Sequence, residues 1–119
     1  MSSDKLLNQE TIDMLFETLE DDFYDVINEF LSVGSNLSKQ IQQIGKNTPV
    51  NTEELICAIH TLKGASGNIG GEHLANLCMK FEADLRNNIT DNLDTRINQI
   101  ADCCTHTCNI FRDKFKKAS

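Results

Sequence analysis

His60 is the residue of this sequence whose type and position best suit it to chemistry. If its segment is helical, at roughly 100° per residue, His60 lies opposite an apolar arc of about 120°. That arc is formed by Leu55, Ala58, Ile59, Leu62, Ala65 and Ile69. A core histidine lies inside such an arc, so we expect His60 to face solvent. A solvent-facing imidazole is largely neutral near pH 7, and in that form it is a nucleophile able to accept a phosphoryl group.

The residues that share a face with His60 suit the binding of an anion. Lys63 and Gly64 follow one turn later and Gly67 two turns later, all within about 60° of His60. A phosphoryl group brings about −1.5 to −2 charges, which the Lys63 ammonium can hydrogen-bond. Each glycine inside a helix costs about 0.8–1 kcal/mol relative to alanine, and close approach of a partner would explain that cost. The alternative is an ordinary solvated pair of His60 and Lys63.

Helical periodicity accounts for most of the chain. Apolar residues recur every three or four positions over residues 9–19, 21–44, 51–69 and 72–87, and again in a last segment after residue 92. Each segment has one apolar stripe, and the connections are short. We therefore expect an all-α fold, an antiparallel up-and-down four-helix bundle with an additional short N-terminal helix across one end. Residues 1–119 are expected to form this single domain.

Polar residues and glycines mark the expected helix ends. Asn51 with Glu54 resembles a capping box at the start of the helix that carries His60. The glycines at 70–71 are expected to end that helix. The acidic residues 20–22 are candidate caps for the long second helix, and residues 91–92 for the last helix.

The charge balance and the cysteines exclude several classes of function. The net charge of −7 and the pI near 4.8 argue against a nucleic-acid partner, which requires a basic face. No run of about 18 apolar residues is present, so we expect no membrane span and a cytoplasmic location. The five cysteines are an odd number without a regular framework, which favours reduced thiols.

A cluster near the C-terminus resembles a set of zinc ligands in composition. It consists of Cys103, Cys104, His106 and Cys108. In a helix, Cys104 and Cys108 point into the apolar stripe, whereas His106 points nearly opposite. We therefore expect no metal site in this chain.

The segment that carries His60 resembles a known family signature. Residues 60–70, which begin His60-Thr61-Leu62-Lys63-Gly64, resemble the signature of histidine-containing phosphotransfer (HPt) domains, His-x-Leu-Lys-Gly followed by small residues and a glycine. The likeness extends to Leu77-Cys78 and Phe81-Glu82, and the helices cover a chain of the size of a free-standing HPt protein. The resemblance implies that His60 is phosphorylated, that Lys63 is the cation beside the phosphate, and that Gly64 clears room beside the imidazole.

The resemblance also points to the next helix. HPt domains often place a glutamine or glutamate there, near the histidine, and this role maps onto Glu82. Met79, Glu82 and Arg86 fall on one flank of that helix and are expected to border the His60 face. Glu82 would orient the imidazole by accepting a proton from one ring nitrogen. Equally, it would form an ordinary i,i+4 salt bridge with Arg86.

A carrier function follows from the resemblance. An HPt domain accepts a phosphoryl group from the aspartate of one receiver domain, including that of a hybrid sensor kinase, and passes it to another receiver. The sequence has no nucleotide-binding glycine loop, and we expect neither kinase nor phosphatase activity. We expect a monomer with no cofactor of its own, and the Mg²⁺ for transfer on the receiver. Alternatives are a helical adaptor that binds receivers without carrying phosphate, and the phosphoacceptor module of a larger kinase.

Transfer needs a docking surface that excludes water around His60. The candidate partner-binding residues are Ile12, Leu15, Phe16, Ile56, Cys57, Gly67, Met79 and Arg86. For five of them, the alternative is that they complete the core beneath the first helix. These are Ile12, Leu15, Phe16, Ile56 and Cys57.

Overall fold

The periodic segments form five helices in the computed structural model, which describes residues 6–115 of the chain. They are α2 (Gln9–Leu19), α3 (Asp22–Gly45), α4 (Thr52–Asn68), α5 (Glu72–Arg86) and α6 (Leu93–Lys114). The described residues contain no strand, which confirms the predicted all-α class. Across this part of the chain, no helix combines the length and the apolar character needed to cross a bilayer.

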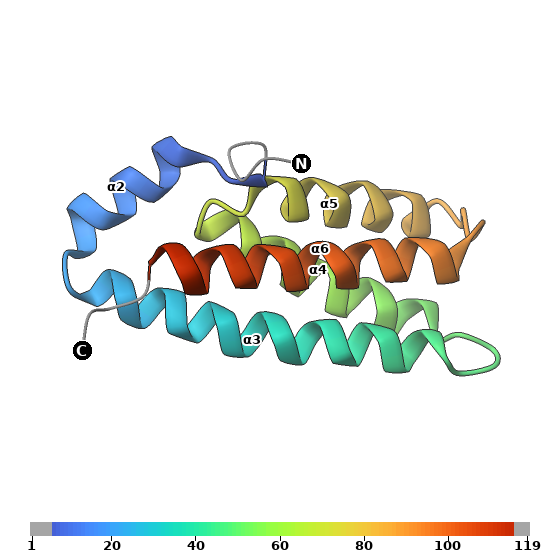
Figure 1. The fold of residues 1–119 in the computed structure, drawn as a ribbon. Coiled ribbons are helices and arrows are strands. Elements are labelled where there is room, and N and C mark those ends of the chain that lie inside the picture. Colours follow the sequence, from blue (N-terminus) through green and yellow to red (C-terminus); the bar gives the residue numbers. More distant parts are fainter. Residues whose placement is uncertain (1–5, 116–119) are drawn as a thin grey trace.

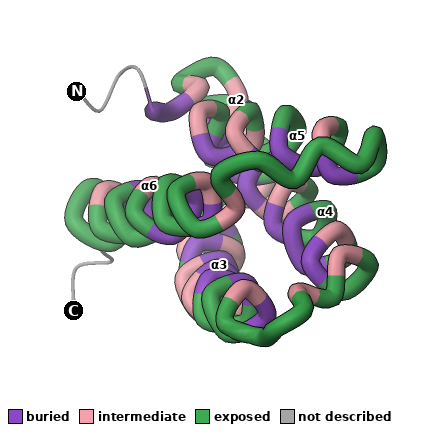
Figure 2. The backbone as a smooth tube through the Cα atoms, turned by 90° about the vertical axis from the view of Figure 1, so that its right-hand side faces the viewer, coloured by how far each residue is buried: buried purple, intermediate pink, exposed green. Residues whose placement is uncertain are grey.

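The four long helices form the predicted up-and-down bundle. Helices α3 to α6 lie side by side along the long axis of the molecule, and α2 crosses one end, where it leads into α3 (Figure 1). Viewed along that axis, the buried residues of the long helices face a shared centre (Figure 2). The largest side chains of this core are aromatic, and Phe23, Phe81 and Phe111 expose at most 1% of their surface. Their burial stabilises the bundle by about 1.5–3 kcal/mol each.

Both ends of α4 are fixed by the residues that the sequence indicated. The Asn51 side chain accepts a hydrogen bond from the Glu54 amide at 3.1 Å, which caps the first turn. At the other end, Gly70 adopts a φ of +84°, a left-handed conformation that favours glycine. The Gly71 amide then bonds back to the Ser66 carbonyl at 2.8 Å, while the Gly70 carbonyl accepts from Asn8 at 2.7 Å. These contacts fix where α4 begins and ends, and with it the position of His60.

Two other helix starts differ from the prediction. Asp21 precedes α3 and Asn92 precedes α6, but neither side chain caps its helix. A side-chain cap requires an extended backbone at the capping residue, as Asn8 and Asn51 have. Asp21 is instead helical, and Asn92 is left-handed with a φ of 57°. The prediction located both helix starts correctly but was wrong about the capping contact.

The conformation of Gly70 predicts a specific loss of stability. We expect Gly70→Ala to lower the free energy of unfolding by about 1–2 kcal/mol or more, because an L-residue is strained at this backbone angle. The added methyl would also lie 3.0 Å from both the Asn8 carbonyl and Ile12. Gly67→Ala is the control, since its methyl would have only Ala75 near it, at 4.0 Å. Urea unfolding followed by circular dichroism measures both, and equal stability of the two variants would contradict the prediction.

Candidate functional site

Helix α4 has a buried face and an exposed face. Leu55, Ile59 and Leu62 have no exposed surface, and Ser66 joins them with its hydroxyl bonded to the Leu62 carbonyl at 2.6 Å. His60 lies on the other side of the helix, and 59% of its side chain is exposed. The exposure expected from the helical periodicity is confirmed.

A buried carboxylate on α5 binds the ring of His60. The Glu82 side chain is only 7% exposed, and its Oε2 and Oε1 atoms lie 3.0 and 3.2 Å from His60 Nδ1. Lys63 Nζ donates to Oε1 at 2.7 Å. Arg86 donates to Oε2 from Nε at 2.9 Å and from Nη2 at 2.8 Å. The two roles considered for Glu82, imidazole orientation and the salt bridge with Arg86, are thus present together, and Lys63 adds a third contact.

The charges around Glu82 keep it ionised. Burial by itself raises the pKa of the Glu82 carboxyl, because it penalises the charged form. The hydrogen bonds from Lys63, Arg86 and His60 outweigh this and lower the pKa to about 2. Glu82 is therefore a carboxylate throughout the physiological pH range.

The ionised state of Glu82 determines which nitrogen of His60 holds a proton. A carboxylate accepts hydrogen bonds and cannot donate one, so Nδ1 must be the donor in its contact with Glu82. In the neutral imidazole, Nε2 then carries the free lone pair. None of the described residues bonds to Nε2, and the ring is largely exposed. The arrangement leaves one nucleophilic nitrogen accessible to an electrophile that arrives from solvent.

The glycines beside His60 have no packing role in this structure. A methyl group added at Gly64 would meet no atom within 4 Å, and one at Gly67 would meet only Ala75 at 4.0 Å. Alanine would fit at both positions and favour the helix by about 0.8–1 kcal/mol. The fold therefore does not require these glycines. They leave the surface next to His60 without protruding side chains.

Ile12 does not belong to an exposed docking surface. Its side chain is only 2% exposed and packs in the core, next to Gly70. The prediction that Ile12 contacts a partner is therefore wrong, because the short helix α2 uses this residue to bind to the bundle. The alternative considered for it, completion of the core under the first helix, is correct.

The remaining partner-binding candidates differ in exposure. Leu15 and Ile56 are half-buried and pack against the core. Phe16 and Met79 expose 50% and 55% of their surfaces, although both are apolar. The exposed group also includes Cys57, Gly67 and Arg86. Met14, which lies outside the apolar stripe of α2, is also an exposed apolar side chain, at 67%.

The cysteine cluster on α6 has a structural role. Cys104 Sγ donates to the Gly34 carbonyl at 3.4 Å, which joins α6 to α3. Cys103 contacts the Thr107 hydroxyl at 3.9 Å. Burial also raises the pKa of the nearby Cys78 thiol to about 12, so it is protonated at neutral pH. Between residues 6 and 115, no three His, Cys, Asp or Glu side chains are grouped so that they could hold a metal ion.

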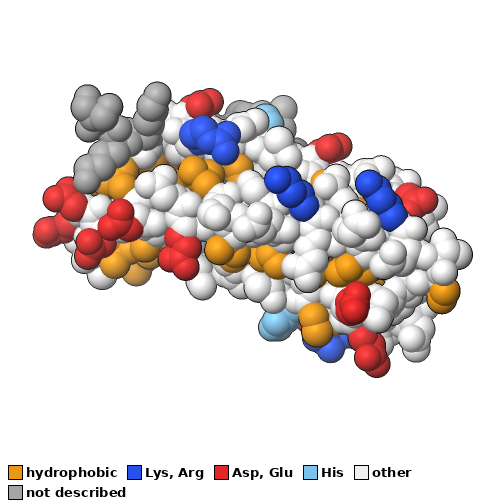
Figure 3. Space-filling view, turned by 90° about the horizontal axis from the view of Figure 1, so that it is seen from below, with side chains coloured by type: hydrophobic (Ala, Val, Ile, Leu, Met, Phe, Trp, Pro, Cys, Tyr) orange, Lys and Arg blue, Asp and Glu red, His pale blue; other side chains and the backbone are white. Residues whose placement is uncertain are grey.

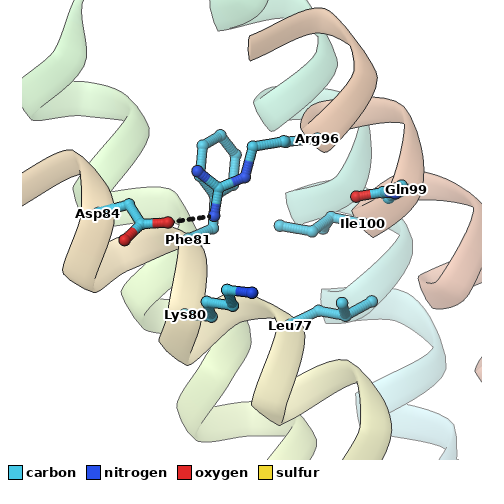
Figure 4. Close-up of a pocket in the computed structure, with 7 residues that line it drawn as sticks. All are labelled: Leu77, Lys80, Phe81, Asp84, Arg96, Gln99 and Ile100. Carbon is cyan, nitrogen blue, oxygen red and sulfur yellow. Dashed lines mark ion pairs between the residues drawn. The ribbon is translucent and has the colours of Figure 1, made fainter. Parts of the chain in front are cut away.

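Two other surface features lie apart from His60. Acidic side chains gather at the end of the molecule where α2 meets α3 (Figure 3). Their residues include Glu17, Glu20, Asp21 and Asp22. A groove between α5 and α6 is occupied by Arg96, which pairs with Asp84 at 2.8 Å and lies 4.5 Å from the ring centre of Phe81 (Figure 4). The charged groups of Arg96 and Asp84 bind each other, so this groove adds no reactive group to the site.

Comparisons with known proteins agree on one family. The family model described as Hpt domain matches residues 10–109. Histidine-containing phosphotransfer protein B (HptB) from Pseudomonas aeruginosa PAO1 superposes with a TM-score of 0.89 at 19% identity, covering 98% of this chain and 100% of that chain. A putative histidine-containing phosphotransfer protein from rice has a TM-score of 0.83 at 20% identity, covering 98% and 85%.

A structure from maize is also similar to this chain. The histidine-containing phosphotransfer protein ZmHP2 has a TM-score of 0.82 at 15% identity, and the match covers 93% of this chain and 90% of that chain. At these identities the structural matches establish the fold. A comparison with curated proteins gives no significant match.

The low pKa of Glu82 predicts a dependence of stability on pH. Its folded pKa of about 2 lies below the ordinary value of 4.5, so its contribution is complete above about pH 5 and is lost as the pH falls toward 2. The shift corresponds to about 3 kcal/mol. We expect Glu82→Gln to flatten the acid side of the stability profile, measured by urea unfolding from pH 2 to 7. Glu17→Gln, at an exposed position on α2, is the control, and the same profile for both variants would contradict the prediction.

Proposed function

Because the chain belongs to the Hpt domain family, we propose that the phosphoryl group it carries is bound to His60. Membership in this family makes the chain a phosphorelay intermediate of two-component signalling that interacts with receiver domains. It is a phosphocarrier with no cofactor of its own, and neither a kinase nor a phosphatase. The observation that carries the proposal is the exposed imidazole whose Nδ1 is bonded to the buried Glu82, which leaves Nε2 free.

We propose that Nε2 of His60 is the atom that is phosphorylated. Its lone pair attacks the phosphorus of an aspartyl phosphate on a receiver, and a P–N bond forms as the P–O bond to the aspartate breaks. The electron pair of that bond stays on the aspartate, which leaves as a carboxylate. The proton on Nδ1 stays in place throughout, so no general base is required. The reverse sequence returns the phosphoryl group to the aspartate of another receiver.

Glu82 supports this transfer through charge. As Nε2 bonds to phosphorus, the ring becomes positively charged, and the carboxylate 3.0 Å from Nδ1 stabilises that charge. Hydrogen bonds to charged groups contribute about 1.5–3 kcal/mol, which is ample to affect the rate. Lys63 is the proposed cation for the phosphoryl oxygens, because its ammonium is one turn from His60 and is 32% exposed.

The receiver is proposed to dock over α4 and its neighbours. The exposed residues available for this contact are Phe16, Cys57, Gly67 and Met79. Leu15 and Ile56, each half-buried, would contribute their exposed parts. Exposed apolar groups on the docking face would suit a contact that excludes water from the phosphoryl group during transfer.

The Mg²⁺ for this transfer is proposed to reside on the receiver. On this side of the contact, Glu82 is the carboxylate beside His60, and both of its oxygens are already bonded to side chains of this chain. We further propose that one partner is the receiver of a hybrid sensor kinase, and that the chain acts as a single-domain monomer. A cytoplasmic location stays a prediction from the sequence.

Phosphorylation of His60 can be tested directly. We expect the chain, incubated with phosphorylated receivers of its own genome, to gain a label that is acid-labile and alkali-stable, as a P–N bond requires. His60→Gln should abolish the label, whereas His106→Gln, at another exposed histidine, should retain it. A chain that binds receivers but takes no label would instead be the adaptor considered from the sequence.

The absence of a side chain at Gly64 predicts that a large residue there slows transfer from a receiver more than from a small donor. We expect Gly64→Leu to slow transfer from a receiver by roughly tenfold or more, because a displacement of about 1 Å in the docked geometry is costly. Phosphorylation by phosphoramidate, a small donor that needs no docking surface, should be much less affected. A Cβ at this exposed position meets no atom within 4 Å, so folding should be retained. Equal slowing with both donors would contradict a role for Gly64 in receiver access.

A further inference from the structure

A pair of buried thiols on α6 has no part in the site around His60. Cys104 and Cys108 are one turn apart, so their side chains lie on the same face of the helix. Their exposed fractions are only 1% and 3%. The two thiols are also hydrogen-bonded to each other. Two sulfur atoms are thus held next to each other on a helix that carries no residue of the His60 site.

Both sulfur atoms face Gly34, in the middle of α3. The Cys104 thiol donates to the Gly34 carbonyl at 3.4 Å, and Cys108 Sγ would lie 3.6 Å from a methyl group added at that glycine. Alanine would favour the helix by about 0.8–1 kcal/mol, and its methyl group would make only ordinary van der Waals contacts. Packing therefore does not account for this glycine, which leaves space beside the two sulfur atoms.

A groove between α3 and α6 leads to the two thiols. It has a volume of about 200 Å³ and is lined by Cys104, Cys108 and polar residues that include Ser35 and Lys39. The Ser35 hydroxyl is hydrogen-bonded to Cys108, and the positive charge of Arg112, one turn further along α6, also acts on that sulfur atom. The groove gives a small ion a route to the sulfur atoms. Lys39 and Arg112 suit a bound complex whose net charge is negative.

Two neighbouring thiols suit a soft ion that needs few ligands. Thiolates select soft ions such as Cu(I), whereas a structural Zn²⁺ site takes four ligands. Among the described residues, no third His, Cys, Asp or Glu side chain joins the pair in a metal-binding group. A disulfide is the other product open to two thiols, but it needs Cβ atoms about 3.5–4.5 Å apart, and Cβ atoms one helical turn apart are separated by about 5–6 Å. An ion bonded to both sulfur atoms spans the longer gap, because it contributes two bonds in place of one.

We propose that Cys104 and Cys108 bind one Cu(I) ion through their two sulfur atoms. As the two S–Cu bonds form, each thiol that carries a proton releases it to solvent, and no electron is transferred. Two thiolates and one Cu(I) ion leave a single net negative charge, which Lys39 and Arg112 offset. The expectation from the sequence that this cluster holds no metal ion concerned a zinc site, for which His106 would also have to converge. The proposal does not depend on the phosphorylation of His60.

Titration with Cu(I) in the absence of oxygen tests the pair. A coloured Cu(I) chelator competes with the chain, and its loss of colour reports the copper that the chain removes. We expect the unmodified chain to bind one Cu(I) ion. Cys104→Ser and Cys108→Ser should each weaken binding by roughly a hundredfold or more, because even the outer partners of a metal site contribute about 10–100-fold to affinity. The matched controls are Cys103→Ser, at the half-buried neighbour on α6, and Cys57→Ser, at the exposed thiol on α4; both should bind like the unmodified chain.

Two further measurements keep the test decisive. Circular dichroism establishes that each serine variant is folded, and X-ray absorption of the copper-loaded, unmodified chain identifies the ligands without any variant. We expect two sulfur neighbours around copper and no nitrogen neighbour. A chain that removes no copper from the chelator overturns the proposal. Nitrogen ligands, or binding that is lost in Cys57→Ser and kept in folded Cys104→Ser, overturn it as well.

Discussion

The buried carboxylate of Glu82 is the constraint on which the rest of the site depends. A carboxylate with 7% exposure is unfavourable unless its oxygens are bonded to charged or polar partners. Those partners come from two helices, since His60 and Lys63 lie on α4 while Arg86 lies on α5. A shift of either helix by one residue would turn these side chains to another face and leave the charge unpaired. The register of α4 against α5 is therefore set by electrostatics as well as by core packing.

The same constraint links the local structure of α4 to Nε2, the nitrogen proposed to react. The Asn51 cap and the left-handed Gly70 fix the ends of α4, and its buried side chains fix its rotation. His60 is then presented to Glu82 with Nδ1 inward and Nε2 outward. A free imidazole samples both tautomers, whereas this one has its proton position determined by a neighbouring helix. The tautomer of one ring thus depends on packing that extends across the bundle.

The sequence predicted the helices well because their signals are local. Apolar periodicity placed all five, and Asn51 and Gly70 marked the ends of α4. The errors arose where the outcome depends on three-dimensional geometry. Asp21 is a suitable capping residue, but its helical backbone directs its side chain away from the amides it would cap. Ile12 belongs to an apolar stripe that could face either the core or a partner, and only the packing of α2 decides between them.

The contacts of the site also depend on three-dimensional geometry, which the sequence does not give. His60 and Lys63 stand out by residue type and spacing, and the resemblance to HPt domains pointed to Glu82. The bond between Lys63 and Glu82, however, depends on how α4 and α5 are aligned. That bond bears on how strongly the carrier would hold a phosphoryl group. A cation that waited free beside His60 would bind a phosphoryl group strongly and resist its onward transfer. In the role proposed for Lys63, a cation that already neutralises Glu82 would give up one anionic partner as it gains another, so the net gain on phosphorylation would be smaller. A relay needs such a balance, because the phosphoryl group must be able to move in both directions.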